Sequence, residues 1–398
     1  MRITWAGTFD PAFGRNRKLA RLLELVGADV EQVRFELWAE DRVEEARGGK
    51  LRAAVKIVLV LPRLFVALLR SPAPDLYLVS YPGWLDAPVV AAVARIRRRP
   101  VLFDPFISLY DTAVVDRRLF AERSLVARVA RLLDRWSLRS ADLVLADTQA
   151  HLDYFGELAG RHLRAGGVLP LGADDSGVAP VPDAAREERL VVFHGTFVPL
   201  QGVATIADAA YLLRDDGVRI RMIGDGQDRA VLDARIADLG LSDLDRVGLL
   251  PLAELPGEIA RATVCLGIFG ASDKAGRVVP NKLYECVAVG RPVVTREGPA
   301  ISTMFSPEEI VTVPAGDPVA LAEAIRRLVA DPERRESVAA AGHDAYVRRF
   351  HEAPLAQRLG EHLDARGRPR GRRRTAAGDG RRGASRRIAP TGRPLPGK

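Results

Sequence analysis

The sequence predicts an α/β protein built from two Rossmann-like, doubly wound domains that face each other across a cleft. Short apolar runs of strand length alternate with helix-periodic segments, and this alternation occurs twice along the 398 residues. Between the two series, residues 171–189 lose all periodicity and are rich in Gly, Pro, Asp and Ser. Ligands of doubly wound sheets bind beyond the carboxyl ends of the strands, so we expect the functional residues in the loops that follow them.

The first series occupies residues 1–172, which we expect to form one domain. Its predicted strands are apolar along most of their length, as is typical of parallel strands that are buried on both faces. They are Ile3–Ala6, Ala28–Phe35, Asp75–Ser80, Pro100–Asp104 and Ala141–Asp147. Helix-periodic segments at 15–26, 85–98 and 117–139 separate them.

The second series occupies residues 190–342 and follows a linker expected at 173–189. Its strands are predicted over 190–194, 218–224, 246–250, 263–269, 293–295 and 309–313. A C-terminal helix is predicted over 343–365. Residues 366–398 contain twelve Lys or Arg and one Asp with almost no apolar residues. We expect this basic tail to be disordered because it cannot bury enough surface to offset the entropy of ordering.

The basic tail accounts for the net charge of +8, because its own +11 leaves −3 for the rest of the chain. It suits nucleic acid or anionic lipid, but a merely solvated tail explains it equally well, and we do not expect a nucleic-acid partner. Cys265 and Cys286 indicate no disulfide framework, and the N-terminus shows no secretory pattern, so a cytoplasmic protein is expected. With no cluster of metal-ligating side chains in the sequence, we expect no metal and no cofactor.

Residues 277–295 (RVVPNKLYECVAVGRPVVT) predict a loop, a short helix and a strand. Asn281 is a favourable N-cap and Gly290 is placed to end the helix. Lys282 stands in the first turn, where its charge opposes the helix dipole unless an anion neutralises it. Glu285 follows one turn later and would accept hydrogen bonds from sugar hydroxyls. An ordinary surface lysine and glutamate explain the same pattern.

Residues 50–70 predict an amphipathic helix with four cations within about 40° of one another and a broad apolar surface opposite. The cations are Arg52, Lys56, Arg63 and Arg70. Their number, together with Pro62, argues against a membrane-spanning helix. Two interpretations remain open: a helix lying on an anionic membrane surface, and a helix packed on the sheet with a solvated basic stripe.

Two loops of the second series have the geometry of a phosphate-binding turn, because each follows a strand and opens a helix. They are HGTFVPLQG (194–202) and the GDG of 224–226. Together with GLLPLAELPGEIARATVCLGIF and PNKLYECVAVGRPVV, in this order, they resemble the nucleotide-sugar-binding domain of the retaining glycosyltransferases of family four, which have the GT-B fold. GTFDPAFGRNR and ADLVLADTQA extend the resemblance to nearly all of residues 1–364.

The resemblance implies an enzyme that moves a sugar from a nucleotide-diphosphate donor to a cell-envelope lipid or polysaccharide acceptor, with retention and without a metal. The donor residues that it implies on the second domain are Gly195, Thr196, Phe197, Gly224, Gly226, Lys274, Pro280, Asn281 and Glu285. The acceptor is expected on the first domain near Gly7, Arg15 and Asp111, and the expected catalytic residues are Asp104, Lys282 and Arg277. A peripheral position on the inner face of the membrane, through residues 50–70, is compatible with such an acceptor.

The sequence departs from the family pattern at three places. Family members usually carry an Arg and a Lys where this chain has Thr196 and Gln201, and a first glutamate where it has Arg277. Lys274, Arg277 and Lys282 are the expected replacements. A non-catalytic sugar-nucleotide-binding or assembly protein of the same fold therefore remains an alternative. Asp104 and Asp111 also have a second interpretation, as residues that cap a loop and a helix.

Overall fold

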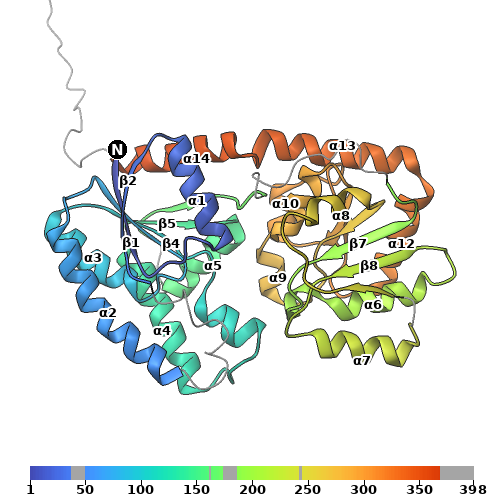
Figure 1. Cartoon of the computed structure of the whole chain (residues 1–398), viewed down its shortest axis with the longest axis horizontal. Helices are drawn as coiled ribbons and strands as arrows, with labels where there is room; N and C mark the ends of the chain where they lie inside the picture. Colours follow the sequence, from blue (N-terminus) through green and yellow to red (C-terminus); the bar gives the residue numbers. More distant parts are fainter. Residues whose placement is uncertain (37–49, 161–162, 174–185, 242–243, 368–398) are drawn as a thin grey trace, which may run out of the picture. The chain divides into compact units, whose positions relative to one another are not determined.

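The computed structural model describes residues 1–36, 50–160, 163–173, 186–241 and 244–367, with the backbone alone for 50–58 and 366–367. Residues 1–367 form one compact unit that contains two six-stranded parallel sheets with helices on both faces (Figure 1). The predicted α/β class with two Rossmann-like domains is confirmed. Most of the expected linker and nearly all of the expected basic tail lie outside the described residues.

The first sheet has the strand order β2-β1-β3-β4-β5-β6, and every adjacent pair is parallel. Its strands are β1 (Arg2–Gly7), β2 (Asp29–Arg34), β3 (Leu76–Ser80), β4 (Val101–Asp104), β5 (Leu143–Ala146) and β6 (Gly166–Val168). The direction of winding reverses between β1 and β3, the place where doubly wound sheets bind ligands. The prediction missed β6, because Gly166 and Gly167 interrupt any apolar pattern.

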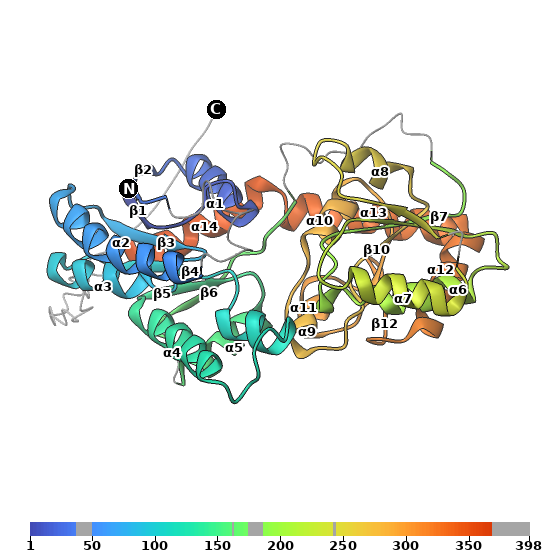
Figure 2. The ribbon, with the colours of Figure 1, turned by 60° about the horizontal axis from the view of Figure 1, so that its bottom comes forward.

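Alternate residues of these strands face two separate cores. Leu76 and Leu78 belong to a core shared with two helices on one face, whereas Tyr77 and Val79 belong to a core shared with four helices on the other. The first pair is α1 (Gly14–Leu25) and α14 (Glu352–Gly367); the other four are α2 (Lys50–Arg70), α3 (Asp86–Arg97), α4 (Leu125–Ser140) and α5 (Gln149–Ala159) (Figure 2).

The helix predicted over 117–139 is wrong at its start. A π-helical segment, η2 (Asp111–Asp116), comes first, and α4 begins only at Leu125, where the Ser124 hydroxyl accepts a hydrogen bond from the Ala127 N–H. Ser124 therefore acts as the N-cap, and the preceding residues stay outside the helix.

The second sheet has the order β12-β11-β10-β7-β8-β9, so its winding reverses between β7 and β10. Its strands are β7 (Leu190–His194), β8 (Arg219–Ile223), β9 (Asp245–Val247), β10 (Val264–Leu266), β11 (Val293–Arg296) and β12 (Val311–Val313). One face packs on α6 (Val203–Leu212), α7 (Arg229–Leu239) and α12 (Pro318–Ala330). The opposite face packs on α8 (Leu255–Arg261), α10 (Asn281–Ala288), α11 (Pro299–Met304) and α13 (Pro332–Arg349).

Three local expectations are corrected in this part of the chain. Lys274 and Arg277 lie on a short helix, α9 (Asp273–Arg277), which the Ser272 side chain caps, and not on a loop. The N-cap of α10 is Pro280, so Asn281 is already the first helical residue. The single helix expected over 343–365 is two helices, because α13 ends at Arg349 and α14 begins at Glu352. No helix among the described residues has the length and apolar character needed to cross a membrane.

Candidate functional site

Lys282 lies buried at the carboxyl edge of the second sheet, beside the loop that follows β7. Its ammonium lies 3.7 Å from the centroid of the Phe193 ring and donates a hydrogen bond to Gln201 Oε1. A Cβ atom on Gly195 would lie 2.7 Å from Lys282 Nζ, and the φ of +150° at Gly195 favours glycine there. The structure thus brings a lysine of α10 to the loop position where the family pattern has its own lysine and this chain has Gln201.

Burial holds the pKa of Lys282 well below its usual value, because removal from water penalises the charged ammonium. The negative charge of Glu285 on the same helix opposes this shift only in part. An ammonium in this position is under-compensated, and an anion placed against it would restore its charge.

Glu285 lies one turn along α10 and forms a hydrogen bond with His194, with 2.7 Å between Glu285 Oε2 and His194 Nε2. Its side chain is 15% exposed, which leaves oxygen lone pairs accessible. His194 is the last residue of β7, and its Nδ1 is buried without a hydrogen-bond partner among the described residues. Sequence reasoning missed His194, although it opens the motif HGTFVPLQG.

The glycine-rich loops after β7 and β8 bind each other. Gly195 N–H donates to the Ile223 carbonyl and Phe197 N–H donates to the Asp225 carbonyl. A Cβ on Gly224 would lie 1.9 Å from the Gly195 oxygen, and one on Gly226 would lie 2.6 Å from the Phe197 oxygen. The expectation that the amides of Gly195 and Phe197 cradle a phosphate is therefore corrected: the glycines are needed for close packing of two loops, and both amides are already paired.

Thr196 is exposed at the tip of the first of these loops, and Pro280 and Asn281 lie at the N-terminus of α10. In the first turn of α10, Leu283 N–H donates to the Pro280 carbonyl, and the positive end of the helix dipole lies at this terminus. Thr196, Pro280 and Asn281 thus stay in the predicted donor site together with Lys282 and Glu285.

Lys274 and Arg277 form ion pairs with acidic side chains of the first domain. Lys274 Nζ lies 3.2 Å from Asp116 Oδ2, and Arg277 Nη2 lies 2.8 Å from Asp111 Oδ1. The Arg277 guanidinium also stacks on Tyr154, 4.2 Å from the ring centroid. These cations balance buried carboxylates, which makes them less suited to a diphosphate than Lys282. Nothing in the sequence indicates a role for Asp116, which stands between two valines and two arginines.

Asp104 and Arg15 form a fully buried ion pair beneath the carboxyl edge of the first sheet. Arg15 Nε lies 2.8 Å from Asp104 Oδ2, and Arg15 Nη1 donates to the Leu169 carbonyl at 2.9 Å. Both side chains are at most 1% exposed, so Asp104 does not stand at an open edge as the sequence suggested. Burial raises the pKa of Asp104, although Arg15 opposes the shift.

A second polar contact, between Asp86 and Thr8, lies at the winding reversal of the first sheet. Asp86 Oδ2 accepts hydrogen bonds from Thr8 N–H at 2.7 Å and from Thr8 Oγ1 at 2.9 Å. A Cβ on Gly7 would lie 2.6 Å from the same oxygen, which explains the glycine at the end of β1. Burial raises the pKa of Asp86. Sequence analysis named Gly7 but not its partner 79 residues later in the chain.

Four partly exposed aromatic side chains gather beside this contact. Phe13 stacks near Tyr81, with 4.5 Å between ring centroids, and Tyr81 meets Trp84 edge-on at 5.4 Å. Phe106 completes the group at 5.6 Å from Phe13. Such rings provide flat apolar surfaces next to polar groups at the position where an acceptor is expected.

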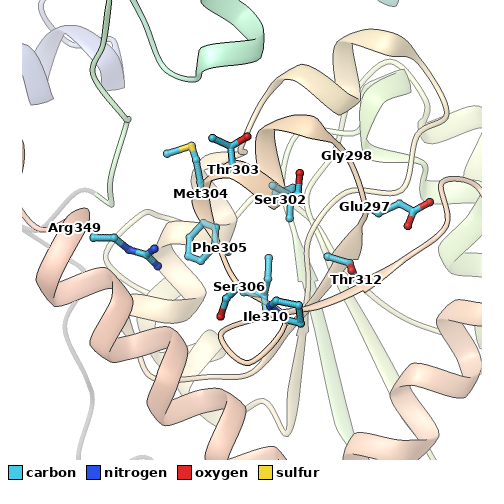
Figure 3. Close-up of a pocket in the computed structure, with 12 residues that line it drawn as sticks. Glu297, Gly298, Ser302, Thr303, Met304, Phe305, Ser306, Ile310, Thr312 and Arg349 are labelled. Carbon is cyan, nitrogen blue, oxygen red and sulfur yellow. The ribbon is translucent and has the colours of Figure 1, made fainter.

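A pocket of about 400 Å³ opens elsewhere on the second domain, between α11, β12 and the end of α13 (Figure 3). Its apolar wall includes Met304, Phe305 and Ile310, and Arg349 reaches it from α13. Arg349 is paired with Glu309. None of the predicted donor residues lines this pocket, so it is separate from the Lys282 site.

Comparison with known proteins assigns both halves of the chain. A family model described as a glycosyl transferase 4-like domain matches residues 13–172, and one described as glycosyl transferase-like matches residues 204–362. The chain is 30% identical over 170 residues to the lipopolysaccharide core biosynthesis glycosyltransferase LpsE of Rhizobium meliloti, which covers 42% of this chain and 47% of that protein. It is 28% identical over 198 residues to the phosphatidyl-myo-inositol mannosyltransferase of Mycobacterium leprae, covering 48% and 51%. The chain spans about half the length of these curated relatives.

Solved structures share the fold along both domains. Anabaena HepE in complex with UDP and glucose has a TM-score of 0.65 at 19% identity and covers 92% of this chain and all of its own. Sucrose-phosphate synthase from Thermosynechococcus elongatus has a TM-score of 0.71 at 18% identity, covering 92% and 98%. Each half of the chain thus matches a glycosyl transferase-like domain model, and the architecture across both halves is the GT-B fold.

Proposed function

We propose that the chain is a retaining, family-four glycosyltransferase that moves a sugar from a nucleotide-diphosphate donor to a lipid or saccharide acceptor of the cell envelope. The observation that carries the proposal is the meeting of Lys282 with Gly195 and Gln201 at the winding reversal of the second sheet, one helical turn from Glu285. Solved relatives of the same fold hold UDP and UDP-glucose, and curated relatives are named for lipopolysaccharide and phosphatidylinositol substrates.

In this proposal Lys282 stabilises the leaving diphosphate. Breakage of the sugar–phosphate bond leaves negative charge on that group, and a buried ammonium acts on it through a low-dielectric environment. The accessible oxygen of Glu285 accepts hydrogen bonds from the ribose hydroxyls. Among the described residues, no group of three or more His, Cys, Asp or Glu side chains is placed to hold a metal ion. Metal independence is part of the proposal, and turnover in EDTA checks it.

The acceptor in this proposal lies on the first domain, against the aromatic group of Phe13, Tyr81, Trp84 and Phe106. Replacing Trp84 by alanine is expected to raise the acceptor KM at least fivefold while donor affinity stays unchanged, because one stacking surface is lost on the acceptor side alone. An unchanged acceptor KM would remove this group from the site.

Nucleotide release from a panel of sugar nucleotides, with and without an envelope lipid extract, tests the function. We expect one donor to be turned over and the extract to accelerate release. Binding of a sugar nucleotide without any release would favour the non-catalytic alternative, and the absence of binding to every nucleotide sugar would contradict the proposed function.

A contact of residues 50–70 with anionic lipid on the cytoplasmic side of the membrane is also proposed. In the described part of α2, Arg63 and Arg70 are exposed, while Val60, Leu64 and Leu68 are buried against the first sheet. The triple variant R52Q/K56Q/R63Q is expected to sediment less with acidic vesicles at low salt, since each cation near such a surface contributes about 1 kcal/mol. Equal sedimentation would show that this basic stripe is merely solvated.

A further inference from the structure

Large apolar side chains form a stripe along the solvent side of α4. Leu125, Val129, Leu132 and Trp136 recur at helical spacing and lie on one line of the helix. They are 75%, 46%, 62% and 57% exposed, respectively. We call these four residues the α4 stripe.

The buried face of α4 also differs from that of an ordinary surface helix. Its buried residues are Ala127, Ala130, Asp134, Ser137, Leu138 and Ser140, of which Leu138 alone is large and apolar. A surface helix normally turns its apolar residues inward and its polar residues outward. In α4 the four large apolar side chains of the stripe are exposed while only Leu138 is buried in the core, so packing within the described fold does not account for the stripe.

The segment before α4 extends the same surface. Leu119 is 56% exposed and Phe120 is 39% exposed, and Val126 adds a further side chain at 48%. Seven large apolar side chains between residues 119 and 136 are therefore accessible. A concentration of exposed large apolar side chains in one segment indicates an interaction site.

Arginines border the stripe. Arg128, Arg131 and Arg135 are exposed and fall within about 60° of one another on one flank of the helix, at 100° per residue. Arg117, Arg118 and Arg123 are exposed in the segment before it. The acidic residues between 117 and 136 are Glu122, which is exposed, and Asp134, which is buried.

We infer that the α4 stripe docks on the surface of an anionic lipid bilayer. Leucine, valine and tryptophan side chains would enter the boundary between head groups and acyl chains, and the flanking guanidinium groups would meet lipid phosphates. A second copy of the chain fits less well, because two such faces brought together would oppose their arginines. An anionic bilayer supplies both the apolar layer and the negative charge.

The buried face of α4 connects this surface to the boundary between the domains. Asp134 accepts hydrogen bonds from Ser108 Oγ at 2.7 Å and from the N–H groups of Leu109 and Tyr110 at 3.0 and 2.8 Å. That loop leads directly into η2, whose Asp111 and Asp116 hold Arg277 and Lys274. Presentation of a lipid-linked acceptor by this surface rests on the proposed function, whereas the lipid contact itself does not.

Co-sedimentation of the full chain with phosphatidylglycerol–phosphatidylcholine vesicles tests the inference. The triple variant L125Q/L132Q/W136Q is expected to lower the partition coefficient more than tenfold, because the apolar anchor is lost. Its matched control is L249Q/L252Q, which replaces two leucines of the second domain that are 75% and 68% exposed. The control is expected to bind like the wild type.

A charge variant separates the two parts of the surface. R128Q/R131Q is expected to lower the partition coefficient roughly fivefold per arginine on acidic vesicles and to leave binding to pure phosphatidylcholine unchanged. R327Q/R334Q, which removes two exposed arginines of the second domain, is its control.

Trp136 provides a readout that does not depend on activity. Its fluorescence is expected to shift to shorter wavelength on addition of acidic vesicles, and W136F is expected to lose the shift. Vesicle binding by L125Q/L132Q/W136Q within twofold of the wild type would overturn the inference. So would a loss of self-association in that variant with lipid binding intact, since the stripe would then join two copies of the chain.

Discussion

Lys282 is the residue on which the proposed donor site depends. A lysine removed from water loses much of its tendency to carry a proton, and Lys282 is buried against an aromatic ring and a glutamine oxygen. A cation in such a place stabilises the ligand-free protein little. It stabilises a bound diphosphate strongly, because charges interact strongly where water is excluded. The same burial that makes Lys282 unfavourable without a ligand makes it effective with one.

Donor binding is expected to take up a proton at Lys282. Its pKa is lowered in the free protein and would rise beside a diphosphate, so uptake occurs at pH values between the free and bound pKa values. Donor affinity falls as pH rises through that window, because the neutral amine must then be protonated. Calorimetry in two buffers of different ionisation enthalpy measures the uptake. Equal uptake by Lys282→Met would assign the proton to another group.

Glu285 is predicted to bind the donor ribose. Glu285→Gln keeps the shape of the side chain and its contact with His194, but weakens charge-assisted hydrogen bonds, so donor binding should lose roughly 1.5 to 3 kcal/mol. Titration of the donor against the variant gives the value, with the exposed Glu333→Gln as a control. Unchanged affinity would remove Glu285 from the site.

At the scale of elements, α9 and η2 join the two domains through paired charges. Each pair combines a cation of α9 with a carboxylate of η2, and all four side chains are at most 17% exposed. Burial lowers the pKa of Lys274 and Asp116 opposes that shift. Removal of one partner of such a pair destabilises the fold, because the remaining charge stays buried without a partner.

The Lys274–Asp116 pair is predicted to couple in a double-mutant cycle. Asp116→Asn and Lys274→Met should each lower the free energy of unfolding by about 3 kcal/mol. The double variant should recover at least half of the summed loss, since neither charge is then stranded. Urea unfolding of the four proteins provides the measurement. Additive losses would mean that the two side chains do not interact.

How far the sequence predicts these elements depends on how local their causes are. Eleven of the twelve strands in the described residues, together with α10, follow from apolar runs, proline and glycine within a few residues. The ion pairs between α9 and η2 join residues more than 150 positions apart, which no local pattern reports. Lys282 is a further case. The sequence shows that Gln201 departs from the family pattern, but not that Gln201 is the residue that Lys282 contacts.

At the scale of the whole molecule, the last helix returns to the first domain. Leu355, Leu359 and Leu363 of α14 are buried in the core that also contains Trp5 and Leu19. The chain thus enters the second domain after residue 189 and completes the first domain only with its residues from 352 onward. Sequence periodicity predicted a helix here but not the sheet on which it packs.

Leu359→Ala is predicted to lower the free energy of unfolding by 2 to 5 kcal/mol, the usual cost of a fully buried leucine. Leu252→Ala, at a position that is 68% exposed, should change it by about 0.5 kcal/mol or less. Removal of residues 368–398 is expected to leave the unfolding curve in place. If Leu359→Ala unfolds like the wild type, α14 does not complete the core of the first domain.

Turnover by Lys282→Met tests the central claim most directly. With the donor that the nucleotide-sugar panel identifies, kcat is expected to fall about 10²-fold and the donor dissociation constant to rise much less, because charge on the leaving diphosphate grows in the transition state. Thermal unfolding establishes that the variant is folded. A Lys282→Met enzyme that turns over at the wild-type rate would mean that the diphosphate is held elsewhere and would contradict this account of the site.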